Sequence, residues 1–246
     1  MSSDDKVAVD DVFSPGRALF RKLVHFFSYH FILTRKRPTT TRVAGFELDV
    51  PPTVFHPKIF VTSSFFARFL QSLDLSGQTV VEVGCGSGIL SLSAAKAGAK
   101  SVLALDINPA AVDAAKVNAV KNSFSQVTSL HSNLFSALPP TSKFDVIIAS
   151  PPSFSGEPRD DADRAWHAGP GYRDILALFD QAAQRLKADG KMYLLISSDT
   201  NRRLMDSLII SAGFACREVA RHSIWVEAFH LFELMRVPAA SLGARE

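Results

Sequence analysis

The sequence has 246 residues, 47% of them hydrophobic, and a formal net charge of +3 at pH 7. This length and composition predict one substantial core, hence a single domain with a small appendage. The charge is too weak to indicate nucleic-acid binding. The two cysteines, Cys85 and Cys216, provide neither a disulfide framework nor a zinc site. With an acidic start unlike a signal peptide, and no apolar run near the roughly 20 residues that span a bilayer, we expect a reduced, cytoplasmic protein without a bound metal.

An N-terminal extension, residues 1–53, precedes the main domain of residues 54–246. It begins with a polar tail, expected to be mobile, to about residue 12. The following stretch, residues 15–32, has apolar residues at helical spacing. This amphipathic helix either lies on an anionic membrane surface or packs on the main domain or a second subunit. The alternating stretch of residues 41–50 then predicts one short strand.

Early in the main domain, a strand, a glycine turn, a helix and a second strand follow one another. A near-continuous β-branched run at residues 79–83 predicts a parallel strand buried on both faces. A helix is expected over residues 87–97, and a second strand over 101–105 ends in Asp106. The turn contains three glycines, Gly84, Gly86 and Gly88. Because glycines bring the backbone close to a ligand, this stretch predicts half of a nucleotide-cofactor site.

The glycine spacing, with Glu82 two residues ahead of it, gives E-x-G-x-G-x-G instead of the dinucleotide fingerprint G-x-G-x-x-G. It resembles motif I of the class I S-adenosylmethionine (SAM) methyltransferases. The resemblance implies that Glu82 attracts the ammonium group of SAM, directly or through water. The glycine turn and the helix N-terminus then favour the carboxylate of SAM, and Asp106 holds its ribose hydroxyls. The alternative is a glycine turn with a structural role only.

Two polar positions flank this predicted cofactor site. A helix expected over residues 62–75 follows a segment that walls the cofactor pocket in many methyltransferases. At its start, the hydroxyl of Thr62 or Ser63 either meets the methionine carboxylate of SAM or caps the helix. A third strand is expected over residues 127–131. At its tip, Asn133 either binds the adenine edge through its amide or serves only in a turn.

The fourth strand, expected over residues 144–149, leads into a proline-rich segment. That segment is Ser150, Pro151, Pro152, Ser153 and Phe154. The two prolines make a stiff carbonyl ledge at the carboxyl end of the sheet, where ligands bind in open α/β folds. The ledge resembles the N-P-P-[YF] motif of amino methyltransferases. The resemblance implies that Ser150 and a proline carbonyl accept hydrogen bonds from an acceptor NH2, while an aromatic ring stacks on the planar group.

This ledge departs from the family motif at two positions. Ser150 stands where the family has Asn or Asp, and Ser153 stands at the aromatic position. Phe154 supplies the aromatic ring only if the loop shifts by one residue. Transfer from an activated sulfonium needs mainly positioning, so a general base is optional. The alternative is a Pro-Pro pair that merely ends the strand.

A long polar loop follows the ledge and is a candidate substrate lid. Trp166 and His167 in this loop, with Tyr172 just beyond it, are candidates for contacting a planar acceptor. His167 is either a base near neutral pH or a solvated side chain. Trp225 and Phe229, near a later turn, either border the acceptor pocket or simply pack.

The rest of the main domain continues the alternation of helices and strands. Helices are expected over residues 109–121 and 200–212, the first starting at a proline. A turn at residues 189–190 leads into a fifth strand. Strands over residues 215–221 and 228–237 follow each other without a helix, which predicts a final antiparallel hairpin. The pattern predicts a seven-stranded, Rossmann-like α/β sheet.

Residues 54–237 resemble the HemK-like protein glutamine methyltransferases, most specifically in the cofactor half and in the stretch 166–190. The resemblance implies the class I methyltransferase sheet, with its last strand antiparallel. Family members that act on bacterial release factors carry a helical N-terminal domain that recruits the substrate. A shorter, different segment stands there in this chain.

We therefore expect a SAM-dependent methyltransferase that modifies a planar nitrogen of a protein glutamine or a small molecule. The alternatives are a biosynthetic small-molecule N- or O-methyltransferase, an rRNA guanine N-methyltransferase and a non-catalytic SAM-binding protein. The oligomeric state stays open. The residues expected to hold SAM and its product S-adenosylhomocysteine are Thr62, Glu82, Gly84, Cys85, Gly86, Gly88, Asp106, Ile107, Asn133, Leu134 and Ser150. The residues expected at the reaction are Ser150, Pro151, Pro152 and Phe154, and those expected to face the acceptor are Ser153, Trp166, His167 and Tyr172.

Overall fold

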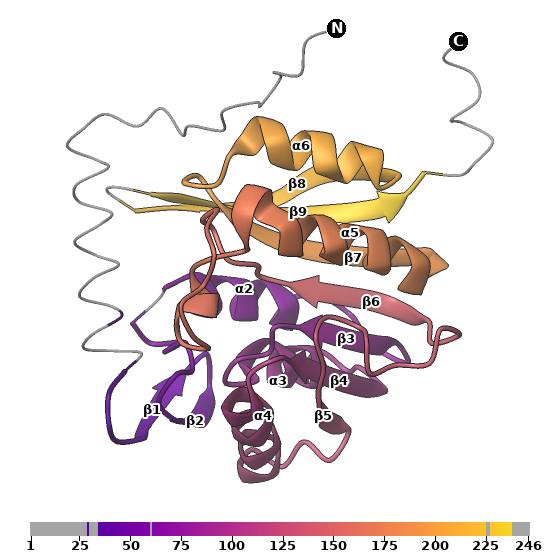
Figure 1. Ribbon diagram of the computed structural model, residues 1–246. Helices are drawn as coiled ribbons and strands as arrows, with labels where there is room; N and C mark the ends of the chain where they lie inside the picture. Colours follow the sequence, from indigo (N-terminus) through magenta and orange to yellow (C-terminus); the bar gives the residue numbers. More distant parts are fainter. Residues whose placement is uncertain (1–28, 30–33, 60, 225–226, 238–246) are drawn as a thin grey trace, which may run out of the picture.

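The computed structural model describes residue 29 and residues 34–59, 61–224 and 227–237, and its ribbon is shown in Figure 1. The expected tail to residue 12 and the amphipathic helix expected over residues 15–32 lie outside the described residues, apart from Tyr29. Within the described ranges, no helix combines the length and apolar character that crossing a bilayer requires.

The expected seven-stranded sheet forms the centre of the molecule (Figure 1). Its strand order is β5-β4-β3-β6-β7-β9-β8. β9 runs antiparallel to both neighbours, whereas the other strands are parallel to one another. The strands are β3 Thr79–Val83, β4 Ser101–Asp106, β5 Val127–His131, β6 Phe144–Ala149, β7 Leu186–Ser197, β8 Phe214–Ser223 and β9 Ala228–Arg236. The chain builds outward from β3 first on one side and then, from β6, on the other, so a topological switch point lies between these two strands.

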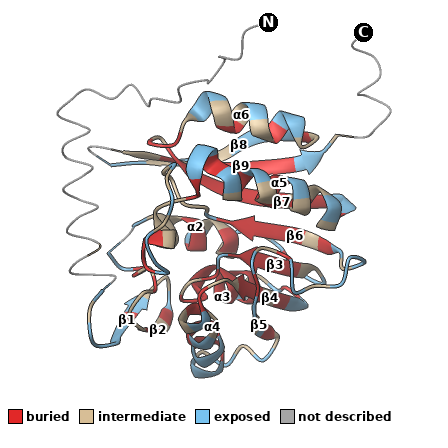
Figure 2. Cartoon of the chain, viewed as in Figure 1, coloured by how far each residue is buried: buried red, intermediate tan, exposed pale blue. Residues whose placement is uncertain are grey.

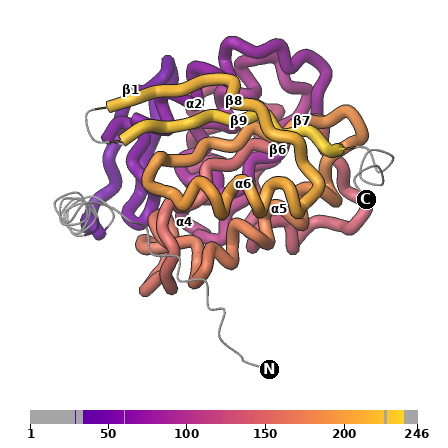
Figure 3. Tube along the Cα trace, turned by 90° about the horizontal axis from the view of Figure 1, so that it is seen from above, coloured from indigo at the N-terminus to yellow at the C-terminus, as the bar shows by residue number. Residues whose placement is uncertain are grey.

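In the described part of the chain, five α-helices cover the two faces of the sheet. The helices α2, α3 and α4 share one core with the residues of β3 and β6 that face them, such as Val80 and Ile148. The alternate residues Val81 and Ile147 point into a second core with α5 and α6. The helices are α2 Val61–Gln71, α3 Ile89–Lys96, α4 Pro109–Lys121, α5 Arg173–Arg185 and α6 Arg202–Ser211. Figure 3 shows α5 and α6 side by side along one face, and Figure 2 shows the central strands buried between the two layers.

The N-terminal part of the domain differs from the prediction of one strand over residues 41–50. The structure folds it into a two-stranded antiparallel hairpin, β1 Thr39–Val43 and β2 Phe46–Val50. The turn residues Ala44 and Gly45 both have positive φ, 51° and 87°, as in the type I′ turns that suit two-residue hairpins. The sequence signal was weak because alanine rarely adopts this conformation.

The hairpin is fastened to α4 by two asparagine side chains. The Asn118 amide accepts from the backbone N–H of Asp49 at 2.8 Å and donates to the carbonyl of the same residue at 3.0 Å. Asn122 bonds the backbone of Glu47 in the same way, at 3.0 and 2.8 Å. The two amides therefore satisfy the backbone N–H and C=O groups at the outer edge of β2, as a neighbouring strand would. Asn118 also donates to the carbonyl of Ser87, at 2.9 Å, which connects the hairpin to the glycine turn.

The turn expected at residues 189–190 is also absent. Those residues lie inside β7, where the pairing with β6 shifts register between Phe144↔Leu186 and Val146↔Lys191. A Cβ on Gly190 would stand 2.8 Å from the Leu186 side chain and 3.0 Å from the carbonyl oxygen of Asp145. The glycine therefore allows close packing at an irregularity within the strand.

Candidate active site

A cavity of about 580 Å³ opens at the carboxyl ends of β3, β4 and β6. Its wall includes the glycine turn, the segment from Ser150 to Phe154, residues on both sides of the start of α2 and part of the long loop after β6. This volume falls in the range of pockets that enclose a whole small molecule. The cavity lies at the switch point between β3 and β6, where open α/β sheets bind their ligands.

The glycine turn gives the cavity an open backbone wall. Gly84 and Gly86 have φ of 79° and 50°, and nothing lies within 4 Å of the position that a Cβ on either would occupy. The N–H groups of Gly84 and Cys85 donate to the carbonyl of Leu105 at 2.8 and 2.9 Å, which holds the turn against β4. The turn therefore needs glycine for its backbone angles, and space for a ligand remains beside it.

The third glycine, Gly88, has a different role. It precedes the first residue of α3 with φ of 80° and does not line the cavity. A Cβ at this position would stand 3.0 Å from both Cα and Cβ of Ala115 in α4. Gly88 thus lets α3 and α4 approach each other behind the turn.

Glu82 supplies a buried carboxyl at the inner end of the cavity. Its side chain is 1% exposed. One carboxyl oxygen accepts from the backbone N–H of Ser91 at 2.8 Å and from the hydroxyl of the same residue. Burial raises the pKa of Glu82 to about 8, although the bonds from Ser91 act in the opposite direction. The site therefore contains an acid that a cationic ligand group can return to its charged form.

Asp106 braces the same wall from the end of β4. One oxygen of its carboxylate accepts from the N–H of Gly86 and the other from the N–H of Asn108, both at 2.9 Å. Burial raises the pKa of Asp106, and these backbone bonds oppose the rise. Asn108, directly before the proline that starts α4, caps this helix through Ala110 N–H and also donates to the hydroxyl of Thr53 at 3.0 Å.

Of the residues expected to hold SAM, Gly88 does not line the cavity, whereas all the others do. They include Thr62, Ile107, Asn133 and Leu134. Thr62 is the second residue of α2, so it does not occupy the N-cap position. The carbonyl of Ile107 lies 2.8 Å from Nε2 of His131, which fixes the chain between β4 and α4 against the end of β5.

The proline ledge follows β6 and also lines the cavity, from Ser150 to Phe154. Tyr172, expected to face the acceptor, is instead fully buried in the core beneath it. Its hydroxyl donates to the carbonyl of Ser153 at 3.3 Å. Tyr172 has a φ of 59°, which directs its ring into the core and away from the loop. Its side chain therefore supports the ledge from the core side.

Aromatic side chains join the ledge to the long loop, which spans residues 155–171. The rings of Phe154 and Trp166 are nearly parallel, 9° apart with centroids at 5.8 Å. Phe55, from the segment before α2, meets Trp166 edge to face at 5.7 Å. One face of Phe154 is therefore covered by Trp166, so the aromatic wall consists of a stack of rings instead of a single exposed platform.

His167 occupies a different environment from that of a solvated loop residue. Its side chain is 20% exposed, lines the cavity and has Nδ1 3.2 Å from a carboxylate oxygen of Asp163. Asp163 is 1% exposed and also accepts bonds from Arg159, at 2.9 Å to Nη2 and 3.1 Å to Nε. Sequence reasoning missed Asp163, although its i,i+4 spacing from His167 was an available signal.

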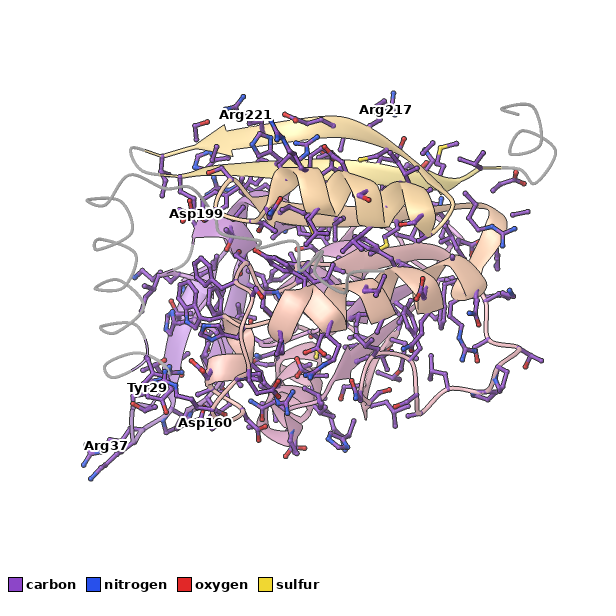
Figure 4. The ribbon with its side chains drawn as sticks, turned by 45° about the horizontal axis from the view of Figure 1, so that its top comes forward. Tyr29, Arg37, Asp160, Asp199, Arg217 and Arg221 are labelled. Carbon is purple, nitrogen blue, oxygen red and sulfur yellow. The ribbon has the colours of Figure 1, made fainter. Side chains whose placement is uncertain are left out.

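The outer end of the loop contacts the N-terminal segment. The hydroxyl of Tyr29 donates to a carboxylate oxygen of Asp160 at 2.5 Å, and the Arg159 guanidinium lies 4.1 Å from the centre of the Tyr29 ring. Figure 4 shows Tyr29 beside Asp160 at one end of the molecule, where the side chain of Arg37 points outward. The loop that carries His167 is thus fixed at its outer surface as well.

The wall contains acidic groups that sequence reasoning also missed. Asp199 and Glu227 line the cavity. They lie just past the paired ends of β7 and β9, where Ser197 faces Phe229; only the strand pairing brings them together. Phe229 lines the cavity and is buried, whereas Trp225 lies outside the described residues. In the described part of the chain, no group of three or more His, Cys, Asp or Glu residues is arranged to hold a metal ion.

Known methyltransferases match stretches of different length in this sequence. The family model for ribosomal protein L11 methyltransferase (PrmA) matches residues 61–150. A Methanocaldococcus jannaschii protein named "Putative protein N5-glutamine methyltransferase" is 31% identical over 188 residues, which are 74% of this chain and 94% of that protein. The ribosomal protein L11 methyltransferase of Escherichia coli is 39% identical over 100 residues, 41% of this chain but only 33% of that enzyme.

Solved structures of methyltransferases share the fold. A T. thermophilus 16S rRNA methyltransferase, solved with AdoMet and guanosine, has a TM-score of 0.60 at 25% identity and covers 81% of this chain and 50% of its own. A ribosomal protein L11 methylase from Lactobacillus delbrueckii subsp. bulgaricus has a TM-score of 0.56 at 22% identity, and the match covers 74% of this chain and 82% of that protein. The second likeness shows the fold alone.

Proposed function

The chain belongs to the class I SAM-dependent methyltransferases of the HemK-like type, and we propose that it methylates a planar nitrogen of a protein glutamine or of a small molecule. The observation that carries the proposal is the glutamine-methyltransferase relative, which is 31% identical and of which this chain covers 94%. The proline ledge supports it, because an N-P-P-type ledge is suited to an acceptor NH2 group.

SAM is the methyl donor of this family, and the chain has residues that fit it. Glu82 offers a carboxyl for the ammonium group, Gly84 and Gly86 leave open space beside their backbone, and Asp106 offers carboxylate oxygens for the ribose. When bound, SAM supplies a methyl group on a sulfonium sulfur, which is already an activated leaving group. The protein therefore contributes mainly orientation and the exclusion of water.

The acceptor side of the proposal rests on the ledge and the rings around it. Ser150 is exposed at the end of β6 and lines the cavity. Its hydroxyl and the carbonyls of the ledge are hydrogen-bond acceptors for an NH2 group. Trp166 and Phe154 form an apolar wall beside them. A planar amide entering between these groups has its N–H donors satisfied while its flat face contacts the rings.

The charge of the cavity favours a protein or small-molecule acceptor over RNA. Among the described lining residues beyond Glu82 and Asp106, the acidic ones are Asp161, Asp174, Asp199 and Glu227, and the permanently cationic one is Arg164. Phosphate groups would be repelled by this excess of carboxylates, whereas RNA-binding surfaces carry arginine and lysine.

The test is the transfer of labelled methyl from SAM in a cell extract that is then separated into protein, RNA and small-molecule fractions. We expect label in protein or in small molecules, stable to base in the manner of an N-methyl group. The matched control is Asp106→Ala, which should remove the transfer by weakening SAM binding. Label confined to RNA, or transfer that is unchanged in the control variant, contradicts the proposal.

A further inference from the structure

We propose that His167 is the proton acceptor of the methyl transfer and that Asp163 is the residue that positions its imidazole. The inference rests on the proposed nitrogen acceptor. The carboxyls of Glu82 and Asp106 already accept backbone hydrogen bonds, and His167 is the imidazole among the described residues that line the cavity.

The backbone holds His167 beside the reaction ledge. The N–H of Phe154 donates to the carbonyl of Trp166 at 3.0 Å, and the N–H of Ala168 donates to the carbonyl of Phe154 at 2.9 Å. These two bonds form a parallel bridge between Phe154 and His167. The position of the imidazole is thus tied to the segment that is expected to hold the acceptor.

The carboxylate of Asp163 lies beside the Nδ1 edge of the ring. Its backbone carbonyl accepts from the N–H of His167 at 3.1 Å, and its carboxylate lies 3.2 Å from the Nδ1 atom of the same residue. Burial alone would raise the pKa of Asp163, but hydrogen bonds from Arg159 and the nearby imidazole lower it to about 2. A carboxylate that stays charged favours a proton on Nδ1, and the lone pair is then on Nε2.

A glycine leaves room for the other edge of the ring. Gly156 has φ of 148°, and a Cβ there would stand 3.1 Å from Cδ2 and 3.7 Å from Nε2 of His167. The centroids of the Phe154 and His167 rings are 6.2 Å apart, and the two ring planes are tilted by 53°. The imidazole is therefore held by a carboxylate, a glycine backbone and an aromatic ring, an arrangement that a solvated side chain would not need.

The chemistry requires a destination for one proton. The lone pair of the acceptor nitrogen forms the new N–CH3 bond, and the electrons of the broken C–S bond stay on sulfur. As this bond forms, the acceptor nitrogen passes its proton to Nε2 of His167. The lone pair of a planar nitrogen is delocalised, and removal of the proton during the transfer releases electron density to the new bond, so a positioned base speeds the step, by roughly 10²–10⁴-fold in typical enzymes.

The tautomer of His167 can be measured without knowing the acceptor. The probe is the full chain, labelled with ¹⁵N and saturated with S-adenosylhomocysteine, in two-bond ¹H–¹⁵N imidazole spectra, where His167→Gln identifies the signal. We expect the Nδ1–H tautomer, and Asp163→Asn should shift the ring towards Nε2–H. An Nε2–H tautomer in the parent chain, or no change in Asp163→Asn, overturns the positioning role.

The catalytic role is tested with the fraction that accepts labelled methyl from the parent chain. His167→Gln should lower kcat about 100-fold or more, with SAM binding within twofold of the parent, and the acid limb of the pH–rate profile should disappear. Asp163→Asn should lower kcat less and displace that limb. The charged groups that share the cavity wall with His167 are Glu82, Asp106, Asp161, Arg164, Asp174, Asp199 and Glu227.

The matched control is the pair of His230 and Glu218, with Nδ1 3.0 Å from the carboxylate, outside the cavity. His230→Gln should leave kcat unchanged. Full activity in His167→Gln, or an equal loss in His230→Gln, overturns the inference. Absence of label with the parent chain would count against the proposed function, while the tautomer measurement still decides the role of Asp163.

Discussion

The carboxyl of Glu82, at the end of β3, accepts two hydrogen bonds from Ser91 in α3, one from the backbone and one from the hydroxyl. The pair joins the first strand of the site to the helix that follows the glycine turn. Burial nevertheless raises the pKa of Glu82 to about 8. Below this pH the ligand-free enzyme holds a proton there, which the ammonium group of SAM is expected to displace.

SAM binding should therefore release a proton and strengthen with rising pH. Between pH 6 and 7.5 we expect the Kd to fall by up to roughly tenfold per pH unit, because each proton released changes the affinity in this way. Calorimetry in two buffers of different ionisation enthalpy measures the release. Glu82→Gln should bind SAM more weakly and without the pH dependence; a parent-like pH dependence in this variant would show that Glu82 is not the group involved.

The same carboxyl should make the stability of the ligand-free protein depend on pH. Its folded pKa, about 8, lies above its ordinary value of 4.5, so the folded state binds more protons between these two values. The free energy of unfolding should then decrease as pH rises from about 5 to 8, by at most roughly 1.4 kcal/mol per unit. Urea unfolding of the parent and Glu82→Gln compares the slopes, and the variant should be flatter. Equal slopes would contradict the burial of a titrating carboxyl.

Alanine substitutions at Gly88 and Gly213 distinguish two effects of an added side chain, backbone strain and overpacking. Their φ values are 80° and 79°, but a Cβ would meet Ala115 at 3.0 Å in the first and nothing within 4 Å in the second. Gly213→Ala should lower the free energy of unfolding by about 1–2 kcal/mol through backbone strain. Gly88→Ala should cost a further ~1–3 kcal/mol from overpacking. Thermal unfolding measures both, and equal losses would mean that α3 and α4 move apart freely.

The sequence predicted the elements around the cofactor site well because their patterns are local. The β-branched run of residues 79–83, the Asn108-Pro109 start of α4 and the proline stop after β6 each depend on neighbouring residues alone. The hairpin at Ala44 was missed because its turn uses an alanine with positive φ. The burial of Tyr172 depends on its φ of 59°, which no residue pattern indicated.

Groups brought together by long-range pairing could not be predicted. Asp199 and Glu227 reach the cavity because β7 and β9 pair antiparallel. Trp166 lies between Phe55 and Phe154 because a segment from before α2 meets the loop after β6. Asp163 and His167 were within reach of sequence reasoning, since their spacing is that of one helical turn. Such a pair is common on exposed surfaces, and only burial distinguishes this one.

Asn118 couples the N-terminal hairpin to the glycine turn. Its amide is fully buried and bonds the backbone of Asp49 and the carbonyl of Ser87. Asn118→Ala leaves these backbone groups without partners and should cost about 2–4 kcal/mol of stability, since each buried unsatisfied group costs roughly 1–3 kcal/mol. SAM affinity should fall as well, because the turn loses its support.

The control for Asn118 is Asn122→Ala. Asn122 bonds the same strand in the same way but does not contact the glycine turn and is partly exposed. It should cost less stability and leave the Kd for SAM unchanged. Chemical denaturation and calorimetry measure the two quantities. If both variants weaken SAM binding equally, the hairpin as a whole supports the turn, and the single bond to Ser87 does not.

Trp166 should report on the filling of the cavity. The sequence has two tryptophans, so Trp225→Phe leaves Trp166 as the single emitter. Because Trp166 lines the cavity and lies between Phe55 and Phe154, an acceptor entering beside the ledge should change its emission. S-adenosylhomocysteine, bound at the glycine turn, should change it less. Titration with the methyl-accepting fraction, in the presence of S-adenosylhomocysteine, measures the response. Trp166→Phe in the parent chain shows what Trp225 contributes, and an unchanged emission from Trp166 throughout would mean that the acceptor binds elsewhere.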